Sequence, residues 1–346
     1  MKNCRLITAS EAPDPGRSFP FIHSRLRLLT TSNPVRPMIR ASCTLLALLT
    51  IGLLPLAAAE SVRVMSFNLW HGGDAGKQPL TQTLEVIRAA RADIIGLQET
   101  GGHEKEKGAG RPDHGRKLAG MLGWHYFDQG ERTGILSRWA ILTNTPRKWG
   151  VTIRLPSGRE VRMFNAHLMH APYQPYQLLK IPYANAPFIS TAGEAVREAV
   201  KARGGQVERL LSELEPALAG GQTVFLTGDF NEPSHQDWTK RAADAGRCVL
   251  EVPFPTTRAV TRAGMRDAYR WTFPDELARP GPTWTPTTKP DDPKDRHDRI
   301  DFVFVGGKGA TVRRCEIVGE ARQFADIIVH PYPSDHRAVV ATVELP

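Results

Sequence analysis

The sequence predicts an α/β protein in which two β-sheets pack face to face and helices cover their outer sides. Three observations lead to this fold class. Short runs of apolar and β-branched residues, which are typical of strands, dominate residues 61–345. Segments with helical spacing fall between some of these runs, and alternating segments that indicate hairpins occupy the middle of the chain. Two stacked sheets with helices outside would bury the apolar faces of all these elements.

The first 59 residues are set apart from this fold by their composition. The segment 38–60, MIRASCTLLALLTIGLLPLAAAE, has a basic start, an apolar run and an Ala-Ala-Ala cleavage site, which is the layout of a secretory signal peptide. A membrane anchor is the alternative, but the apolar run is shorter than a bilayer span requires. We therefore predict a leader over residues 1–59 with a signal peptide at 38–59, and a secreted or periplasmic mature protein without an integral membrane segment.

Residues 60–346 are predicted to form a single domain, because they contain no long Gly/Ser/Pro linker and no internal repeat. The leader holds seven Lys/Arg and two Asp/Glu, so leaving it out lowers the net charge from +9 to +4. This mild excess of positive charge is compatible with a phosphate-bearing substrate. The basic residues form no long stripe along the sequence, which would have indicated nucleic-acid binding. We expect a monomer.

Two cysteines, Cys248 and Cys315, remain after the leader is removed. In an exported protein such a pair can form a disulfide, and two buried free thiols are the alternative. No C-x-x-C motif occurs, so thiol-based zinc or redox chemistry has no support.

In the first half of the chain, the spacing of apolar residues predicts the helices and strands. A buried strand at 61–70 precedes a helix at 80–93, whose apolar residues recur at helical spacing, and a second buried strand follows at 93–100. A short helix at 114–123 closes at a glycine. Short strands are then predicted over WHYFD, GILSR and AILTNT, within 124–145.

In the second half, residues 149–155 and 159–167 alternate between polar and apolar side chains around a Ser-Gly turn, which predicts a hairpin. Residues 191–218 are predicted to be helical, with an apolar face that includes Val200 and a weak point at Gly204-Gly205. The remaining strands are predicted at 224–231, 299–305, 311–319 and 338–345.

Polar side chains stand at the ends of these strands. In TVFLTGDFNEP (223–233), Asp229 and Asn231 are two residues apart, so an extended backbone would point both to the same side. Alone, this segment reads as a turn, because Gly, Asp and Asn are common turn residues. Six such clusters at strand ends indicate a shared site instead. Their members are Asn68, Glu99, Asn165, His167, Asp229, Asn231, Arg299, Asp301, Ser334, Asp335 and His336.

Three of these residues, Asn68, Glu99 and Asp335, supply hard oxygen ligands. Mg²⁺ typically takes one or two carboxylates and completes its coordination with water and substrate oxygens. We therefore predict a Mg²⁺ site, with Mn²⁺ and Ca²⁺ as alternatives.

The other residues supply groups for proton transfer. His167 and His336 can give or stabilise charge near neutral pH, and Asp301 can orient His336 through a carboxylate–imidazole hydrogen bond. Asp229, with Asn231, can position and deprotonate water. Together these groups fit metal-assisted, in-line attack of water on a phosphoester. The G-x-S-x-G and H-E-x-x-H motifs of serine hydrolases and zinc peptidases do not occur.

At these positions the sequence resembles the endonuclease/exonuclease/phosphatase superfamily of metal-dependent phosphohydrolases. The matching segments follow the family's order across 62–343 and are MSFNLW, LQET, GILSR, FNAHL, LTGDFN, RIDFVF and PSDHRAVV. The resemblance implies a four-layer α/β/β/α sandwich with the site at one end of the sheets. It also implies roles for the site residues. Glu99, with Asn68 and Asp335, would hold the metal, and Asp229 would activate the water. Asn231 would contact the phosphate or transition state, His336, supported by Asp301, would bind the scissile phosphate, and His167 would be the second histidine.

Within this superfamily the histidine at position 167 separates subgroups. Pancreatic-type deoxyribonucleases, bacterial sphingomyelinases and cytolethal distending toxin nucleases carry a histidine at the position that His167 matches. Abasic-site endonucleases carry a tyrosine there and an acid two residues after the first Asn, where this chain has Trp70. The resemblance therefore disfavours a role in DNA repair.

The predicted substrate contacts are Asn165, Arg299, Tyr173 and Tyr176. Both tyrosines lie in an insertion after His167, at 169–195, which departs from the family's simple pattern. The insertion can be a flap that reads the substrate or a loop whose tyrosines pack against the edge of the sandwich. For Trp284 the same two alternatives, packing or a substrate wall, stay open.

The sequence therefore predicts an exported, Mg²⁺-dependent phosphoester hydrolase that favours diesters. A non-specific extracellular deoxyribonuclease and a sphingomyelinase-like lipid phosphodiesterase are alternatives, so nucleic acid is one candidate substrate. A non-catalytic binding domain on the same fold is the alternative of another class; it would lack one or more of Glu99, Asp229 and His336, and all three are present.

Overall fold

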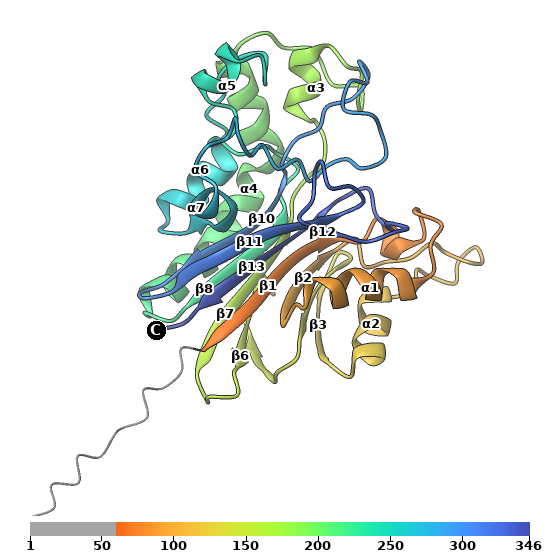
Figure 1. Cartoon of the computed structure of the whole chain (residues 1–346), viewed down its shortest axis with the longest axis vertical. Coiled ribbons are helices and arrows are strands. Elements are labelled where there is room, and N and C mark those ends of the chain that lie inside the picture. Colours follow the sequence, from red (N-terminus) through yellow and green to blue (C-terminus); the bar gives the residue numbers. More distant parts are fainter. Residues whose placement is uncertain (1–59) are drawn as a thin grey trace, which may run out of the picture. The chain divides into compact units, whose positions relative to one another are not determined.

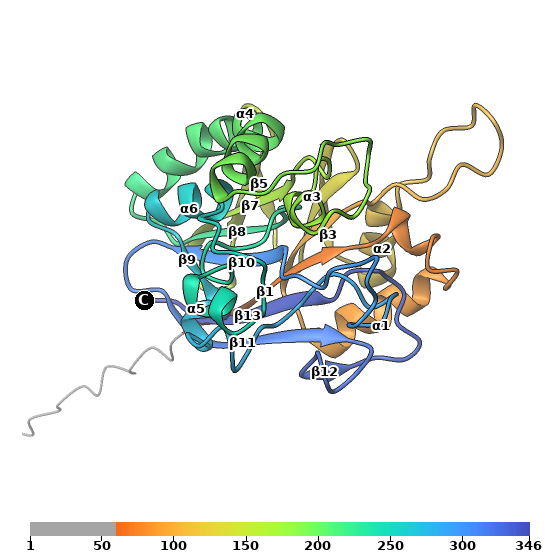
Figure 2. The same cartoon turned by 90° about the horizontal axis from the view of Figure 1, so that it is seen from above.

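The computed structural model describes residues 60–346, and the predicted leader with its signal peptide lies outside the described residues. Two mixed β-sheets face each other and helices cover their outer sides (Figures 1 and 2). The predicted α/β fold class is confirmed. In the described part of the chain no helix is both long and apolar enough to cross a membrane.

The first sheet has seven strands and joins the two ends of the described chain. Its central strand β1 pairs in antiparallel fashion with β13 and in parallel with β2. In spatial order the strands are β12 (Ile327–Ile328), β11 (Thr311–Gly319), β13 (Ala338–Glu344), β1 (Ser61–Asn68), β2 (Ile94–Gln98), β4 (Thr133–Ser137) and β3 (His125–Gly130).

The second sheet has six strands and contains the predicted hairpin, whose strands β6 and β7 are antiparallel and joined through Gly158 at φ +86°. In spatial order the strands are β5 (Ile141–Asn144), β6 (Gly150–Arg154), β7 (Glu160–His167), β8 (Val224–Asp229), β10 (Asp301–Gly306) and β9 (Arg266–Asp267).

Helices complete the two outer layers. Residues of α1 and α2 pack on the seven-stranded sheet, and residues of α4 and α6 pack on the six-stranded sheet. The helices are α1 (Leu80–Ala90), α2 (His114–Leu122), α3 (Gln174–Leu179), α4 (Ala192–Ala219), α5 (Lys240–Asp244), α6 (Pro255–Arg262) and α7 (Ala268–Thr272), with a 3₁₀ turn at His71–Gly73.

Three clusters of buried apolar side chains fill the spaces between these layers. The central cluster joins the two sheets, for example through Val64 of β1 and Phe225 of β8. The second places Ile87 of α1 against the seven-stranded sheet, and the third places Leu210 of α4 against the six-stranded sheet. These contacts build the α/β/β/α sandwich that the resemblance implied.

Strand pairing brings the predicted site residues to one end of the sandwich. The parallel strands β1 and β2 end together, with Asn68 paired to Gln98. In the other sheet, β7 and β8 are parallel and β10 is antiparallel to β8. His167, Asp229 and Asp301 therefore lie in one row of paired residues.

Some elements differ from the sequence prediction. Helix α4 runs through Gly204 and Gly205 without a break, because its apolar side packs on the sheet, and Val200, predicted on that side, is half exposed. The short elements α3, α5, α6, α7, β9 and β12 have too few residues to show a period and were not predicted. Cys248 and Cys315 are buried free thiols, which settles the alternative left open above.

The predicted substrate contact of Asn165 is corrected by its position between the two sheets. Its side chain is buried, and its amide nitrogen donates to the Leu97 carbonyl at 3.0 Å and to Oε1 of Gln129 at 2.8 Å. Its Oδ1 accepts from Gln98 at 2.6 Å and from Thr227 at 3.1 Å. Hydrogen bonds to the other sheet and to neighbouring β8 use both polar atoms of the amide, which leaves no group for a substrate.

The same close approach explains a glycine inside β2. A Cβ atom on Gly96 would lie 1.9 Å from Oγ1 of Thr227 and 2.4 Å from Oδ1 of Asn165. Since real side chains never approach so closely, only glycine allows this polar contact between the sheets.

Replacing Asn165 tests this structural role. We expect Asn165→Ala to lower the free energy of unfolding by about 3 kcal/mol, because several buried polar groups each lose a hydrogen-bond partner. Urea denaturation followed by circular dichroism measures this change. Asn144→Ala, the same substitution at an exposed position of β5, should change it by less than about 0.5 kcal/mol. Equal effects of the two substitutions would contradict the assignment.

Candidate active site

The carboxylate of Asp229 lies at the centre of the candidate site. β8 carries an apolar run into the sandwich and ends at this residue, which is buried. Its Oδ2 accepts from Nδ2 of Asn68 at 2.9 Å, and its Oδ1 accepts from the backbone amide of Asn231 at 2.9 Å. One carboxylate therefore joins the end of β8 to the end of β1 in the other sheet.

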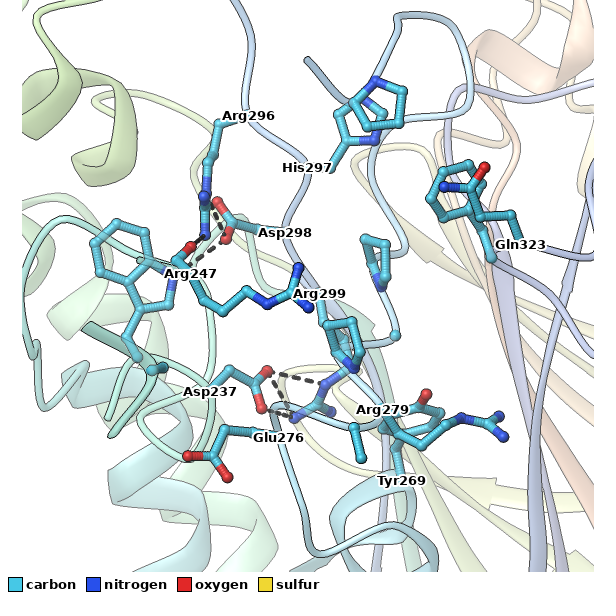
Figure 3. Close-up of a pocket in the computed structure, with 18 of the residues that line it drawn as sticks. Asp237, Arg247, Tyr269, Glu276, Arg279, Arg296, His297, Asp298, Arg299 and Gln323 are labelled. Atoms are coloured by element: carbon cyan, nitrogen blue, oxygen red, sulfur yellow. Dashed lines mark hydrogen bonds and ion pairs between the residues drawn. The ribbon is translucent and has the colours of Figure 1, made fainter. Parts of the chain in front are cut away.

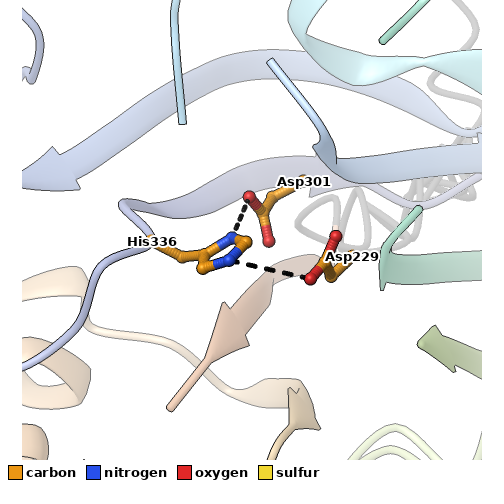
Figure 4. A group of neighbouring side chains, drawn as sticks. All are labelled: Asp229, Asp301 and His336. Carbon is orange, nitrogen blue, oxygen red and sulfur yellow. Dashed lines mark hydrogen bonds and ion pairs between the residues drawn. The ribbon is translucent and has the colours of Figure 1, made fainter. Parts of the chain in front are cut away.

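His336 and Asp301 form the hydrogen bond that the sequence predicted. Nδ1 of His336 lies 2.9 Å from Oδ2 of Asp301, and its Nε2 lies 3.8 Å from Oδ2 of Asp229 (Figure 4). The hydroxyl of Ser334 accepts from the His336 amide at 3.0 Å and donates to the Asn68 carbonyl at 2.7 Å. The loop before β13 is thereby attached to the end of β1.

The imidazole of His167 also lies close to Asp229. Its Nε2 is 3.6 Å from Oδ2 of Asp229 and 4.0 Å from Oε1 of Glu99. Glu99 follows β2 with φ +54°, and its Oε2 accepts from the backbone amide of His71 at 3.1 Å. Asp229 is thus placed between two imidazoles, with Glu99 beside one of them.

Burial gives the surrounding carboxyl groups different proton affinities. Burial by itself would raise the pKa of Glu99, but the imidazoles of His167 and His336 together lower it below its usual value. Burial raises the pKa of Asp335 to about 6, and the negative charges of Glu99 and Asp229 add to the rise. The other groups of the chain therefore compensate the negative charge of the Asp335 carboxylate poorly.

The carboxylates around His336 favour its charged form. Burial opposes a charge on the ring, but the carboxylates of Asp301, Asp229 and Asp335 outweigh burial and raise the pKa of His336 well above its usual value. A protonated imidazole at this position can donate a hydrogen bond from Nε2 and stabilise an anion.

The donor set fits a divalent cation with oxygen ligands. In the described part of the chain, the four carboxylates of Glu99, Asp229, Asp301 and Asp335 form no ion pair with Lys or Arg. Oδ1 of Asp335 is buried and has no hydrogen-bond partner. The side chains of Glu99 and Asp335 are each 19% exposed, so a ligand can reach them. Mg²⁺ uses such a pair of carboxylates and completes its shell with water.

The orientation of Asn68 differs from its predicted ligand role. Its Nδ2 donates to Asp229 and lies 3.4 Å from Oε1 of Glu99, while its Oδ1 accepts from the Trp70 amide at 2.9 Å. Metal ligation through Oδ1 would require the amide to turn over. In the structure Asn68 instead orients the two carboxylates.

Another group that could hold an ion consists of Asp229, Asp301 and His336, whose ligand atoms lie within 4.8 Å of one another. The carboxylates of Asp229 and Asp301 are almost fully buried, and Nδ1 of His336 is hydrogen-bonded to Asp301. Glu99 and Asp335 are therefore the better candidates for a metal centre.

The predicted shared face of Asp229 and Asn231 is wrong, because the chain turns directly after β8. Asn231 adopts φ +49°, and its Nδ2 donates to the Leu168 carbonyl at 3.1 Å. Strand alternation therefore does not extend to it. It lies beside the site and stabilises Asp229 through its backbone amide.

Arg299 is also corrected, from substrate contact to structural ion pair. Its side chain is buried and lies 2.7 Å from a carboxylate oxygen of Asp267 and 2.9 Å from one of Asp237. The two carboxylates use the hydrogen-bond donors of the guanidinium, so no donor is left for a substrate.

Tyr173 and Tyr176 are buried and not exposed on a flap. The Tyr173 hydroxyl donates to Asp298 at 2.8 Å, and the Tyr176 hydroxyl donates to Asp295. Of the two alternatives for the insertion, packing is the one found for these residues. Tyr183 of the same insertion, which was not among the predicted site residues, is 37% exposed and lies against Tyr176.

Two cavities lie outside the cluster of carboxylates. The larger, of about 730 Å³, is lined by Asp237, Arg296, His297 and other residues and contains none of the four site carboxylates (Figure 3). The smaller, of about 300 Å³, adjoins His167.

Comparisons with known proteins show the family and the fold of the chain. Residues 65–336 match the model of the endonuclease/exonuclease/phosphatase family. An uncharacterised Caenorhabditis elegans protein, F14F9.5, is 26% identical over 313 residues, which cover 82% of this chain and 92% of that protein. The crystal structure of an endonuclease/exonuclease/phosphatase from Beutenbergia cavernae is similar in fold. It has a TM-score of 0.51 and 17% identity, over 82% of this chain and 72% of that one.

The charged state of His336 can be measured directly. In EDTA, we expect its ring protons to titrate in NMR spectra with a pKa above the usual value of about 6.5. Asp301→Asn should lower that pKa, because it removes the nearest negative charge. The stability that protonated His336 contributes is fully present below about pH 6.5 and is lost as pH rises through the higher folded-state pKa.

Assignment of the signal uses His336→Gln, which should remove it. A ring that titrates below the usual value, or one that Asp301→Asn leaves unchanged, would contradict the electrostatic arrangement.

Proposed function

The chain belongs to the endonuclease/exonuclease/phosphatase family, and on that premise we propose that it is an exported, Mg²⁺-dependent phosphodiester hydrolase. The observation that carries the proposal is that Oδ2 of Asp229 lies 3.6 Å from Nε2 of His167 and 3.8 Å from Nε2 of His336. Carboxylate oxygens of Glu99 and Asp335 each lie 4.0 Å from one of these imidazoles. Export is proposed from the predicted signal peptide alone.

Asp229 is the proposed base for the attacking water. Its Oδ2 faces both imidazoles, and Asn68 and the Asn231 amide hold the carboxylate in one orientation. It would take the proton of the water as the oxygen bonds to phosphorus and the bond from phosphorus to the leaving oxygen breaks. A buried carboxylate fixed by two hydrogen bonds is oriented before the substrate arrives.

His336 is the proposed phosphate-binding group. Its protonated Nε2 can donate to a non-bridging phosphoryl oxygen, and Asp301 fixes the ring by accepting from Nδ1. His167 can donate from the other side of the same phosphate. A cation held by Glu99 and Asp335, with Asn68 beside them, would supply further positive charge against the phosphoryl and leaving oxygens.

A nuclease activity is the second candidate, and the cavity beside His167 favours it. Its lining includes Trp149, three cationic side chains and one carboxylate, so its charge is positive in balance; the charged residues are Arg147, Lys148, Arg209 and Glu131. Among the described residues none of the three cations forms an ion pair. Cations and an aromatic ring next to a catalytic site are features of surfaces that bind single-stranded nucleic acid.

Hydrolysis of bis-p-nitrophenyl phosphate tests the proposed function. The purified protein should hydrolyse it with Mg²⁺ and lose the activity in EDTA. Asp229→Asn and His336→Ala should each lower kcat by about 100-fold or more, because each removes a group that acts in the transition state.

Matched controls are Asp244→Asn and His125→Ala, which make the same kinds of change at exposed positions away from the site and should keep kcat within about twofold. Full activity in EDTA or in both site variants would overturn the proposal. Nicking of plasmid DNA under the same conditions separates the nuclease from hydrolases of lipid or small phosphodiesters.

A further inference from the structure

Beyond the reaction itself, we propose that an aromatic surface beside His336 binds a planar ring carried by one arm of the phosphodiester substrate. This aromatic wall consists of Trp284, Tyr176 and Tyr183; Trp284 and Tyr183 offer the accessible surface, and the buried ring of Tyr176 joins them. Its assignment rests on the proposed function of the same site. The inference specifies a planar ring in the substrate, which the carboxylates and imidazoles of the site do not determine.

Ring-to-ring contacts connect the wall to the catalytic histidine. The ring centroids of Trp284 and His336 are 6.4 Å apart, and those of Trp284 and Tyr176 are 5.8 Å apart. Tyr183 continues the series with its ring edge-on to Tyr176 at 5.6 Å and an interplanar angle of 84°. The three rings therefore form a continuous series of contacts that begins at the proposed phosphate-binding group.

The wall is held rigid from behind. Tyr173 contacts both Tyr176, at 5.1 Å, and Trp284, at 5.6 Å, and its hydroxyl is hydrogen-bonded to Asp298. The backbone of Trp284 pairs with that of Asp298 and bridges to that of His336. A surface fixed in this way loses little conformational freedom on binding, which favours affinity.

Tyr183 is the exposed end of the wall. It keeps 37% of its surface open, whereas Tyr173 and Tyr176 are 3% and 7% exposed. Burial first, and then the carboxylates of Asp229, Glu99 and Asp335, raise the pKa of Tyr183. All three carboxylates act on this hydroxyl, which is consistent with a ring that overhangs the site.

The charges around the wall restrict its ligand. Nearby carboxylates disfavour an anionic ring, and aromatic side chains offer flat faces on which uncharged planar rings stack. An aryl ester or a nucleobase fits these conditions. A flexible acyl chain would gain contact area but no stacking.

Binding of two phosphonates that differ only in a ring tests the inference. With Mg²⁺ present, calorimetry on the wild-type protein should give a Kd for phenylphosphonate about tenfold lower than for methylphosphonate. Tyr183→Ala should reduce this preference to twofold or less and leave the Kd of methylphosphonate unchanged. Tyr183→Phe should keep the preference, because stacking needs the ring and not the hydroxyl.

The matched control is Phe188→Ala, an aromatic residue of the same insertion that is 50% exposed and contacts no ring of the wall. It should retain the tenfold preference. Absence of a preference in the wild type, failure of both phosphonates to bind, or an unchanged preference in Tyr183→Ala would overturn the inference. Tighter binding of octylphosphonate than of phenylphosphonate would also overturn it in favour of an apolar chain.

These binding measurements do not depend on turnover. A protein that hydrolyses bis-p-nitrophenyl phosphate but shows no ring preference would retain the proposed function and lose the aromatic subsite. A protein that shows the ring preference and hydrolyses no phosphodiester would lose the proposed function instead.

Discussion

The buried negative charge of Asp229 is the constraint on which the arrangement of the site depends. A carboxylate removed from water is costly unless hydrogen-bond donors or positive charge surround it. Here Asn68 reaches it from the other sheet, the Asn231 amide caps it from the following turn, and two imidazoles lie within 4 Å. Because Asn68 and His336 come from the other sheet, the charge is fully compensated only when both sheets are packed together. Folding and assembly of the catalytic groups are therefore one event.

The remaining carboxylates extend this argument from stability to function. Glu99 and Asp335 add negative charge around the same point, and Asp335 keeps a buried oxygen without a partner. The chain alone does not supply enough positive charge to balance such a cluster of carboxylates, and an unbalanced negative charge is expected of a cation site. His336 is suited to bind an anion. The surrounding carboxylates favour its charged form, and its Nε2 stays available to an anionic ligand.

The sequence predicted the layers and the residue types of the site because both follow from local rules. Apolar runs locate strands, and polar residues at their ends gather wherever parallel strands finish at one edge. It could not tell which polar groups at those ends would serve the fold. Asn165 and Arg299 have the same chemistry as catalytic residues, but partners contributed by distant segments occupy them fully. Tyr176 and Tyr183 are close in sequence, and only the packing of residues 282–298 behind the insertion decides which is buried.

The central claim is that Glu99 and Asp335 hold the cation while His336 stays free to bind phosphate. Anomalous X-ray diffraction from crystals of the protein grown with Mn²⁺ tests it most directly. We predict one strong peak within bonding distance of carboxylate oxygens of Glu99 and Asp335 and too far from His336 for a bond. A peak bonded to His336 or Asp301, or no peak near Glu99, would contradict this arrangement.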